Sequence, residues 1–404
     1  MVSYDENSGE LTFHNYMDFD DLKDYAEIVY EMTKDGLTVE KGKLTDVSAA
    51  PHSDGKAELK LQIPAAGRIY LKLTYLLKKE MPLLERGHVL GFDEIKLSNE
   101  DGRNRQAVKW MEQKPAFGSI SVKETDTEIA LQAKDFSYII DKRTGLFHQI
   151  RFGGRDYLNH PMELNIWRAP TDNDRYIRTE WEKAGYDKAC ARAYSIKTVQ
   201  RESGVQLTEH LAVAAPTVQK ILDVELIWEI DGNGTISSQI SAVKEEEFPE
   251  LPRFGIRLFL NKKLENVSYF GMGPQESYRD KCQGSSHGCY RAKVSQLHED
   301  YIRPQENGSH FDCDYVTAAN TQFGITAVSE QPFSFQASVY TQEELERTLH
   351  NYELKESDST VLCIDYALNG IGSNSCGPAV LEKYRFDDTN FQFRFMLVPF
   401  FKES

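Results

Sequence analysis

The chain has 404 residues, of which 63 are Asp or Glu and 47 are Lys or Arg, so its formal net charge is -16. This acidic balance disfavours nucleic acid and anionic membranes as partners, and no hydrophobic run is long enough to span a bilayer. A neutral partner is favoured instead, and the length predicts roughly two or three domains.

The cysteines and the first residues bear on the compartment. Six cysteines occur without a CxxC pair or a Cys/His spacing that suits zinc. Residues 1–7 lack the basic region and apolar run of a signal peptide. We therefore expect thiols in a reducing, cytoplasmic environment. The cysteines are Cys190, Cys282, Cys289, Cys313, Cys363 and Cys376.

Apolar and polar residues alternate with a period of two along much of the chain, which predicts half-buried antiparallel strands. Turn sequences such as 152–155 (FGGR) and 231–234 (DGNG) lie between these runs, as hairpin connections do. The alternating positions are Leu59, Leu61 and Ile63; Ile69, Leu71, Leu73 and Tyr75; Leu222, Val224, Leu226, Trp228 and Ile230; and Phe391, Phe393, Phe395 and Leu397.

Two short helices are predicted among the strands. Thr179 and Glu182 have the spacing of a capping box before residues 184–185, and Thr341 and Glu344 have the same spacing further along the chain. Neither pattern supports more than a few turns. The fold is therefore expected to be mainly β.

A change in composition divides the chain into two parts. Residues 99–105 are polar, and residues 114–118 (KPAFG) form a cluster of helix and strand breakers. The part before them has about a hundred residues, the size of an immunoglobulin-like domain. We predict a β-sandwich over 1–105, a linker over 106–118 and a larger β domain over 119–404.

Four polar segments of the larger domain carry the most specific signal. They are 166–174 (IWRAPTDND), 271–278 (GMGPQESY), 303–308 (RPQENG) and 371–378 (IGSNSCGP). Taken singly, each is a turn or loop rich in hydrogen-bonding groups. Together and in this order, they resemble the C-terminal domain of family 2 glycoside hydrolases of the β-galactosidase type, with its RAP-x-DND signature.

The resemblance implies an all-β fold, in which an immunoglobulin-like β-sandwich precedes a large antiparallel β-supersandwich similar to galactose mutarotases. Residues 85–92 (ERGHVLGF) look like the last strands of the sandwich that follows the catalytic barrel in this family. The chain has no run of alternating strands and helices that could form a (β/α)₈ barrel. We therefore expect the C-terminal, non-catalytic portion of a β-galactosidase, either a natural small subunit or a cut fragment, inactive alone.

The resemblance also implies the chemistry and partners of the complete enzyme. That enzyme would hydrolyse terminal β-D-galactosides with retention through two glutamates. It would bind magnesium and sodium on the missing part and assemble as a homo-oligomer. In this chain we expect no catalytic residue, metal or cofactor, and its partners would be the N-terminal catalytic part and the galactoside substrate.

Arg168, Asp172, Asn173 and Asp174 are expected to form a network that anchors their own loop. A guanidinium can bind a carboxylate through two bonds, while the second Asp and the Asn bind loop backbone. Such a network either only holds the loop's shape or, as the resemblance implies, anchors a mobile segment at the border of the active site. Only residues 175–178 precede the predicted helix, fewer than in some relatives, which argues against a lid.

The loop 372–378 combines glycines, a proline and small polar residues, which predicts an exposed, tight turn. In the family the matching loop reaches the mouth of the sugar pocket, so Asn374, Ser375 and Cys376 are predicted to line the pocket wall. Some relatives carry a tryptophan where this chain has Cys376, and stacking of a sugar on that residue is therefore not expected. No neighbour in sequence activates the thiol, so it should be a contact and not a nucleophile.

Glu276, Glu306 and Asn307 are the polar residues of the second and third motifs. The two glutamates could be interpreted as a catalytic pair. Both lie beside Gly or Pro in turns, where a carboxylate commonly accepts backbone N–H bonds. A structural role is favoured for all three.

His287, His298 and His310 with Asp312 leave two alternatives open. They could form a metal site, or His310 could act with one of the two glutamates as the acid/base pair of an aldose 1-epimerase. The spacing is not a known ligand pattern, and an isolated His in a β domain is commonly structural. A sugar-binding module without chemistry is a further alternative, ranked above the epimerase.

Overall fold

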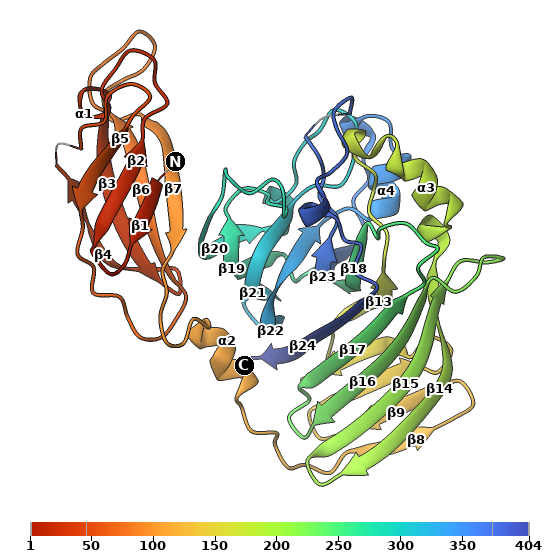
Figure 1. The fold of residues 1–404 in the computed structure, drawn as a ribbon. Coiled ribbons are helices and arrows are strands. Elements are labelled where there is room, and N and C mark those ends of the chain that lie inside the picture. Colours follow the sequence, from red (N-terminus) through yellow and green to blue (C-terminus); the bar gives the residue numbers. More distant parts are fainter. Residues whose placement is uncertain (1, 46, 374, 403–404) are drawn as a thin grey trace. The chain divides into compact units, whose positions relative to one another are not determined.

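The computed structural model describes residues 2–45, 47–373 and 375–402, and these lie mainly in β-strands (Figure 1). The chain divides into two compact units, Met1–Lys109 with His287–Cys289, and Trp110–Ser286 with Tyr290–Ser404. The change of unit falls within the stretch expected to be a linker. Part of that stretch is helical, because α2 spans Arg105–Met111.

The smaller unit is an antiparallel β-sandwich. One sheet has the strand order β1-β2-β5 and the other β4-β3-β6-β7. Apolar side chains such as Phe13, Ile28 and Leu71 are buried in a common core. The elements are β1 (Val2–Asp5), β2 (Glu10–His14), α1 (Leu22–Tyr25), β3 (Ala26–Lys34), β4 (Leu37–Leu44), β5 (Asp54–Glu58), β6 (Ile69–Leu77) and β7 (Val89–Lys96).

The predicted strand through Leu59, Leu61 and Ile63 is wrong. Strand β5 pairs with β2 and ends at Glu58, opposite Glu10, the first residue of β2. No β2 residue remains beyond this point to pair with the chain. The three side chains still pack on the core. The alternation of apolar and polar residues therefore reflects burial of these side chains and not a paired strand.

The larger unit contains two sheets. The smaller has the order β12-β11-β10-β9-β8, and the larger has the order β13-β18-β23-β22-β24-β17-β16-β15-β14, with β19, β20 and β21 attached beside it. Figure 1 shows β8 and β9 behind β14 to β17, and one hydrophobic core contains side chains of both sheets. This all-β architecture is the predicted one.

The strands of the smaller sheet are β8 (Ser121–Glu124), β9 (Glu128–Gln132), β10 (Phe136–Asp141), β11 (Leu146–Phe152) and β12 (Arg155–Asp156). Those of the larger sheet are β13 (Leu158–Asn165), β14 (Cys190–Arg201), β15 (Gly204–Ala214), β16 (Leu222–Asp231), β17 (Ile236–Lys244), β18 (Arg253–Asn261), β19 (Asn266–Gly273), β20 (Ser286–Lys293), β21 (Ser309–Ala319), β22 (Phe323–Ser338), β23 (Ser359–Leu368) and β24 (Asn390–Phe401).

Strand β16 shows why the alternating pattern succeeds in the large sheet. Its apolar positions from Leu222 to Ile230 are buried at every second residue, and the residues between them are half-buried or exposed. The strand is paired on both sides, with β15 and β17, over nearly its whole length. A side-chain period of two therefore coincides with backbone pairing.

The two predicted helices have different outcomes. Helix α4 (Gln342–Arg347) begins as predicted, because the Thr341 hydroxyl accepts from the Glu344 N–H at 3.1 Å. The predicted N-cap at Thr179 is wrong, since α3 (Ile177–Lys183) has its N-cap three residues earlier, at Tyr176. The buried Trp181 holds this helix against the unit, and its packing extends the helix by nearly one turn toward the N-terminus.

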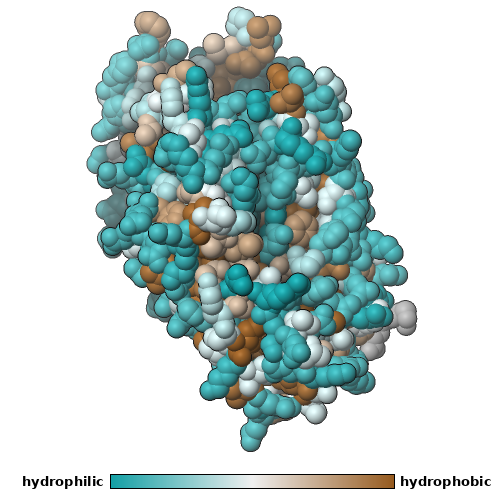
Figure 2. All heavy atoms as spheres, turned by 90° about the vertical axis from the view of Figure 1, so that its right-hand side faces the viewer, coloured by the Kyte–Doolittle hydropathy of each residue, from teal (hydrophilic) through white to brown (hydrophobic). Residues whose placement is uncertain are grey.

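Short 3₁₀ turns complete the described elements: η1 (Asp172–Asp174), η2 (Tyr186–Lys188), η3 (Val294–Gln296), η4 (Asn351–Glu353) and η5 (Glu382–Tyr384). Across the described residues, every helix is too short or too polar to cross a bilayer. On the face seen in Figure 2, hydrophilic residues predominate and hydrophobic ones come to the surface in small groups.

Candidate functional site

Three of the four motif segments, far apart in sequence, line one cleft of the larger unit: the first, the third and the fourth. The second lies beside it, where Glu276 is bonded to Tyr301 of the cleft wall. The first segment lies between β13 and α3 (Figure 1), the second includes the end of β19, the third precedes β21 and the fourth follows β23. The cleft has a volume of about 730 Å³. Its lining residues are Thr171, Asp172, Asn173, Asp280, Lys281, Tyr301, Gln305, Glu306, Ile371, Gly372, Ser373, Pro378, Ala379, Val380, Leu381 and Tyr384.

Arg168 links the first motif to the two residues that precede the fourth. Its guanidinium, fully buried, donates to both carboxylate oxygens of Asp174 at 2.6 and 3.2 Å. The same group donates to the carbonyls of Asn369 at 2.6 Å and Gly370 at 3.1 Å. It also lies over the Trp181 ring, 5.3 Å from the centroid. One buried cation thus holds two loops together.

Asn173 and Asp172 join the first motif to other loops in different ways. The Asn173 side-chain amide donates to the Gly372 carbonyl at 3.2 Å. Asp172 contributes its backbone N–H, which donates to Gln305 Oε1 at 3.0 Å, while its side chain belongs to an exposed residue on the cleft wall. The structure therefore brings Arg168, Asn173 and Asp174 into one set of loop contacts and leaves the Asp172 carboxylate at the surface.

Carboxylates of the second motif region hold neighbouring loops. Glu276 accepts from the Tyr301 hydroxyl at 2.5 Å and the Gly308 N–H at 2.8 Å, and it contacts Lys281. Asp280 accepts from the backbone N–H groups of Ile371 at 3.0 Å and Gly372 at 2.8 Å. Both carboxylates accept hydrogen bonds from backbone N–H groups, and Glu276 also contacts a lysine. This is the structural role expected for Glu276.

Glu306 lies at the base of the cleft and is 2% exposed. Its Oε2 accepts from Arg253 at 3.4 Å, and its Oε1 has no hydrogen-bond partner within the described part of the chain. Burial raises the pKa of Glu306 to about 7, against the opposing effect of Arg253 and Arg168. The carboxyl is therefore poised between its neutral and charged forms at neutral pH.

Asn307, next to Glu306, has a local role. Its side-chain oxygen accepts from the Glu299 N–H at 3.0 Å, and its amide donates to the Gln305 carbonyl at 2.9 Å. Its carbonyl accepts from Gln336 at 2.5 Å. These bonds fix the turn that carries Glu306.

The loop of the fourth motif reaches the cleft through the residues around its tip. Ser373 and Pro378 line the cleft. Asn374, predicted as part of a pocket wall, lies outside the described residues. Ser375 is half-buried and Cys376 is exposed, and both lie outside the lining of this cleft. Their contact with a substrate stays a prediction.

The histidines occupy separate environments. His310 is fully buried. Its Nδ1 lies within hydrogen-bond distance of the Tyr269 hydroxyl (3.1 Å) and the Met272 carbonyl (3.2 Å), and its ring stacks on Phe335 with the centroids 5.0 Å apart. Burial lowers the pKa of His310 to about 4, and that of His298 is also lowered by burial. His310 is absent from the cleft lining. A core histidine that stays neutral is poorly placed to exchange protons with a sugar.

Within residues 2–45, 47–373 and 375–402, no group of three or more His, Cys, Asp or Glu side chains is arranged to hold a metal ion. Of the carboxylates in or beside the cleft, those of Glu276, Asp280 and Glu306 are engaged with backbone N–H groups, lysine or arginine, and that of Asp172 is exposed. These side chains do not fit the magnesium and sodium that the resemblance implies for the complete enzyme.

Sequence reasoning missed four polar or aromatic residues of the cleft: Asp280, Lys281, Tyr301 and Tyr384. The first two directly follow the second motif, and Tyr301 stands two residues before the third. Proximity to the motifs was thus an available signal for these three. Tyr384, on η5, had no such signal, because the chain returns to the cleft only in the folded state.

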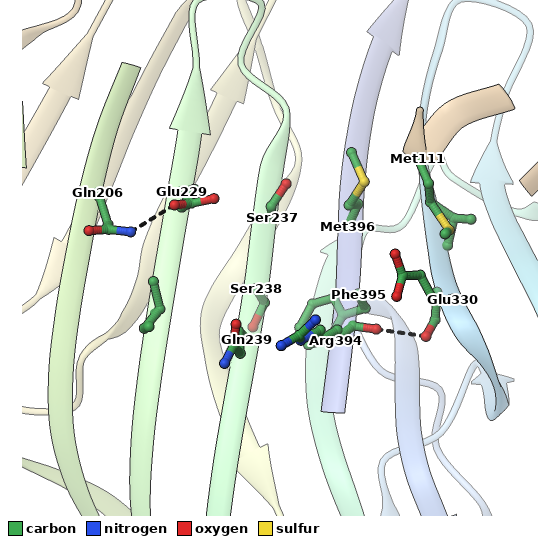
Figure 3. A pocket seen from close by; sticks show the side chains of 13 residues that line it. Met111, Gln206, Glu229, Ser237, Ser238, Gln239, Glu330, Arg394, Phe395 and Met396 are labelled. Atoms are coloured by element: carbon green, nitrogen blue, oxygen red, sulfur yellow. Dashed lines mark hydrogen bonds between the residues drawn. The ribbon is translucent and has the colours of Figure 1, made fainter. Parts of the chain in front are cut away.

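A second, smaller cleft of about 240 Å³ lies on the outward face of the large sheet (Figure 3). Strand register places Gln206, Glu229, Ser237 and Met396 side by side on successive strands, and Gln206 donates to Glu229 at 2.7 Å. Met111 of α2 lies at its edge. Its lining residues come from outside the four motifs, so the larger cleft is the candidate site.

Two family models match the chain. One, described as "Beta galactosidase small chain", matches residues 132–397, and the other, "Beta-galactosidase, domain 4", matches residues 11–98. The chain belongs to the β-galactosidase family. The match of the small-chain model includes all four motif segments, three of which line the cleft.

Individual β-galactosidases support the same assignment. The β-galactosidase of Actinobacillus pleuropneumoniae is 42% identical over 96% of this chain, and that of Staphylococcus xylosus is 30% identical over 96%. The chain spans only 38% of the length of each of these relatives. It corresponds to a C-terminal part of a β-galactosidase.

A solved structure named for a different activity also shows a distant likeness to the chain. Galactose 1-epimerase from Lactobacillus acidophilus NCFM matches 71% of this chain and 100% of its own length, with a TM-score of 0.40 and 8% sequence identity. Such a distant likeness supports no functional conclusion.

Proposed function

We propose that this chain is the non-catalytic C-terminal portion of a β-galactosidase and supplies one wall of its sugar pocket. The observation that carries the proposal is that the first, third and fourth motif segments line one cleft, with Glu276 of the second bonded to Tyr301 of that cleft. Loops that hold function commonly stand on a rigid scaffold. Here the scaffold is the large sheet, and the buried Arg168–Asp174 pair fixes the loops on it.

The absence of catalysis is inferred from the use of the carboxylates. Retaining glycosidases need an acid/base and a nucleophile whose carboxyl groups are about 5 Å apart and free to reach the sugar. Glu276 and Asp280 are bound to backbone N–H groups, and Glu306 is buried beside Arg253. Each of these groups would have to abandon a structural role before it could attack a glycosidic bond.

The pocket wall is proposed to comprise the tip of the fourth motif. Cys376 is exposed and would contact the sugar or its aglycone, with Ser375 beside it. Two tyrosines line the adjoining cleft, Tyr301 and Tyr384, and a phenol ring offers both a stacking face and a polar edge. Tyr384 is our candidate for the aromatic contact that Cys376 cannot provide.

The complete enzyme would carry the remaining properties that the resemblance implies. It is proposed to be a cytoplasmic homo-oligomer that hydrolyses terminal β-D-galactosides with retention. Magnesium and sodium would be bound by the catalytic part.

The test is hydrolysis of a chromogenic β-galactoside by the purified chain, alone and mixed with the catalytic part. We expect no turnover by the chain alone and recovery on mixing. Turnover by the chain alone would show that it carries its own carboxylate pair, and would overturn the proposal.

A sugar-binding module is the second candidate, favoured by the polar cleft with its two tyrosines. It predicts measurable galactose affinity for the isolated chain by calorimetry, reduced in Tyr384→Ala. An epimerase has weaker support, because its candidate base, His310, is buried in the core. Mutarotation by the chain that is lost in His310→Ala would be required to favour it.

A further inference from the structure

One end of the smaller unit gathers several loops. The side-chain amide of Asn15, after β2, donates at 2.8 Å to the Ala49 carbonyl, in the loop that follows β4. The N–H of Lys78, after β6, donates at 2.9 Å to the Tyr25 carbonyl, at the end of α1. These segments therefore form a single end of the sandwich, the upper one in Figure 1.

This end exposes large apolar side chains. Single exposed apolar residues are common on soluble proteins, but several gathered at one place mark an interaction surface. We name this group the apolar end. Its members and their exposed fractions are Tyr16 (64%), Phe19 (92%), Met81 (41%), Leu83 (103%) and Val89 (55%).

Leu83 is the most unusual member. Its φ is +70°, a conformation that costs a residue with a Cβ about 1–2 kcal/mol and costs glycine almost nothing. The flanking backbone closes the turn through mutual bonds between Met81 and Leu84 at 3.0 and 3.1 Å. A leucine here gains no burial within its own unit. The turn instead leaves the Leu83 side chain fully exposed, where it can contact another surface.

The start of the described chain lies at this same end. Val2, the first residue of β1, pairs with Phe13 near the end of β2, and Asp5 pairs with Glu10 at the opposite end. Any segment that precedes Val2 therefore joins the unit beside the apolar end. In the relatives, most of the length lies outside the 38% that this chain matches.

We infer that the apolar end packs against the catalytic part of the same enzyme, an inference that rests on the proposed function. A covalent connection at this end keeps the catalytic part within reach of the apolar end. Burial of Phe19 and Leu83 would remove apolar area from water and restrain the joint. The smaller unit would then act as a docking element and not only as a spacer.

The chain offers a matched control. Leu37 is 68% exposed, and it begins β4 opposite Lys34, at the far end of the same sandwich. It shares residue type and exposure with Leu83 but lies away from the apolar end. An effect confined to Leu83 and Phe19 would therefore report position and not surface hydrophobicity in general.

The first experiment places a benzophenone amino acid at Leu83, Phe19 or Leu37 in the complete enzyme that contains this chain. After irradiation, the cross-linked peptides are identified by mass spectrometry. We expect Leu83 and Phe19 to capture peptides of the catalytic part, and Leu37 not to do so. Capture of a second copy of this chain, of residues within the chain only, or equal capture from Leu37 would overturn the inference.

The second experiment measures association in trans between the chain and the catalytic part. Replacement of Phe19 or Leu83 by Ser should weaken binding by about tenfold each, while Leu37→Ser should change it less than about twofold. Thermal unfolding of each variant reports any loss of fold. Equal affinities for all variants would overturn the docking inference.

Failure of the two proposals can be told apart. If the complete enzyme hydrolyses a β-galactoside but Leu83 captures nothing from the catalytic part, only the docking inference fails. If the cross-link forms in a protein that does not hydrolyse β-galactosides, the proposed function fails and the docking surface stands.

Discussion

Two regions of the larger unit bury carboxylates in different surroundings. Beneath the cleft, Asp174 pairs with Arg168 and Asp365 pairs with Arg253, each through two bonds. On β15, Glu209 is 2% exposed, and among the described residues neither of its carboxylate oxygens has a hydrogen-bond partner.

The difference shows what an arginine contributes at equal burial. Burial raises the pKa of Glu209 well above its ordinary value, with no opposing charge. Burial also raises the pKa of Glu306, but Arg253 and Arg168 oppose the rise, which ends at about 7. The arginines therefore limit the rise in the pKa of Glu306, whereas nothing opposes the burial that favours Glu209 as a neutral acid in the core.

Glycine makes room for the isolated acid. Gly145, in the turn between β10 and β11, has a φ of +74°, and a Cβ added to it would lie 2.3 Å from Glu209 Oε2. Both the backbone conformation and the space favour glycine here. The core is thus adapted to the glutamate in shape, although it offers no hydrogen bond.

The largest effect is expected when Arg168, the buried cation beneath the cleft, is removed. Arg168→Ala leaves Asp174 buried without its partner and should lower the unfolding free energy by about 3–5 kcal/mol. Urea denaturation at pH 7 measures the loss. Arg178→Ala is the control, because its pair with Glu182 is partly exposed and should be worth about 1 kcal/mol or less. Equal losses in the two variants would contradict a special role for the buried pair.

The second test follows Glu306 through pH. Its folded pKa of about 7 is above the ordinary 4.5, so the folded state holds the proton more tightly. The stability that this provides is full below about pH 4.5, declines as pH rises to about 7 and is constant above, a loss of roughly 3 kcal/mol. The stability difference between wild type and Glu306→Gln should show this decline. A flat difference between pH 4 and 8 would mean that the carboxyl is not desolvated.

The third test converts the isolated acid into an apolar side chain. Glu209→Met keeps the length and removes unsatisfied polar atoms, so it should raise the unfolding free energy by about 1–3 kcal/mol at pH 8. Because the pKa of Glu209 is raised, wild type loses stability as pH increases, and the gain should be smaller at pH 5. Thermal unfolding at both pH values measures it. Destabilisation at pH 8 would show that the carboxyl has favourable contacts.

The smallest expected effect concerns helix capping, which lies outside the two regions with buried carboxylates and gives a reference value for a single hydrogen bond. Thr341→Ala removes the N-cap of α4 and should cost about 1 kcal/mol, while Thr179→Ala, inside α3, should cost less than half of that. Chemical denaturation of the two variants gives the comparison. A larger cost at Thr179 would restore the capping role that the sequence pattern suggested.

Local sequence patterns correctly predicted strands that are paired on both sides and a helix whose N-cap bond lies within its first turn. The alternation from Leu222 to Ile230 became β16, and the Thr341 cap began α4. The same reasoning failed at Leu59 to Ile63, where apolar positions pack without a strand to pair with. It also misplaced the start of α3, where the packing of Trp181 extended the helix.

The amino-acid sequence by itself determined the all-β class, the four motif segments and the family that they resemble, because side-chain periodicity and turn chemistry are local properties. Only the tertiary structure decided which of these residues share a site. Arg168 meets the Asn369 and Gly370 carbonyls two hundred residues away, and Tyr384 reaches the cleft from outside every motif. The pairing of Asp365 with Arg253 and the isolation of Glu209 likewise depend on which strands become neighbours. That choice is set by the global packing of the sheets and not by any short segment.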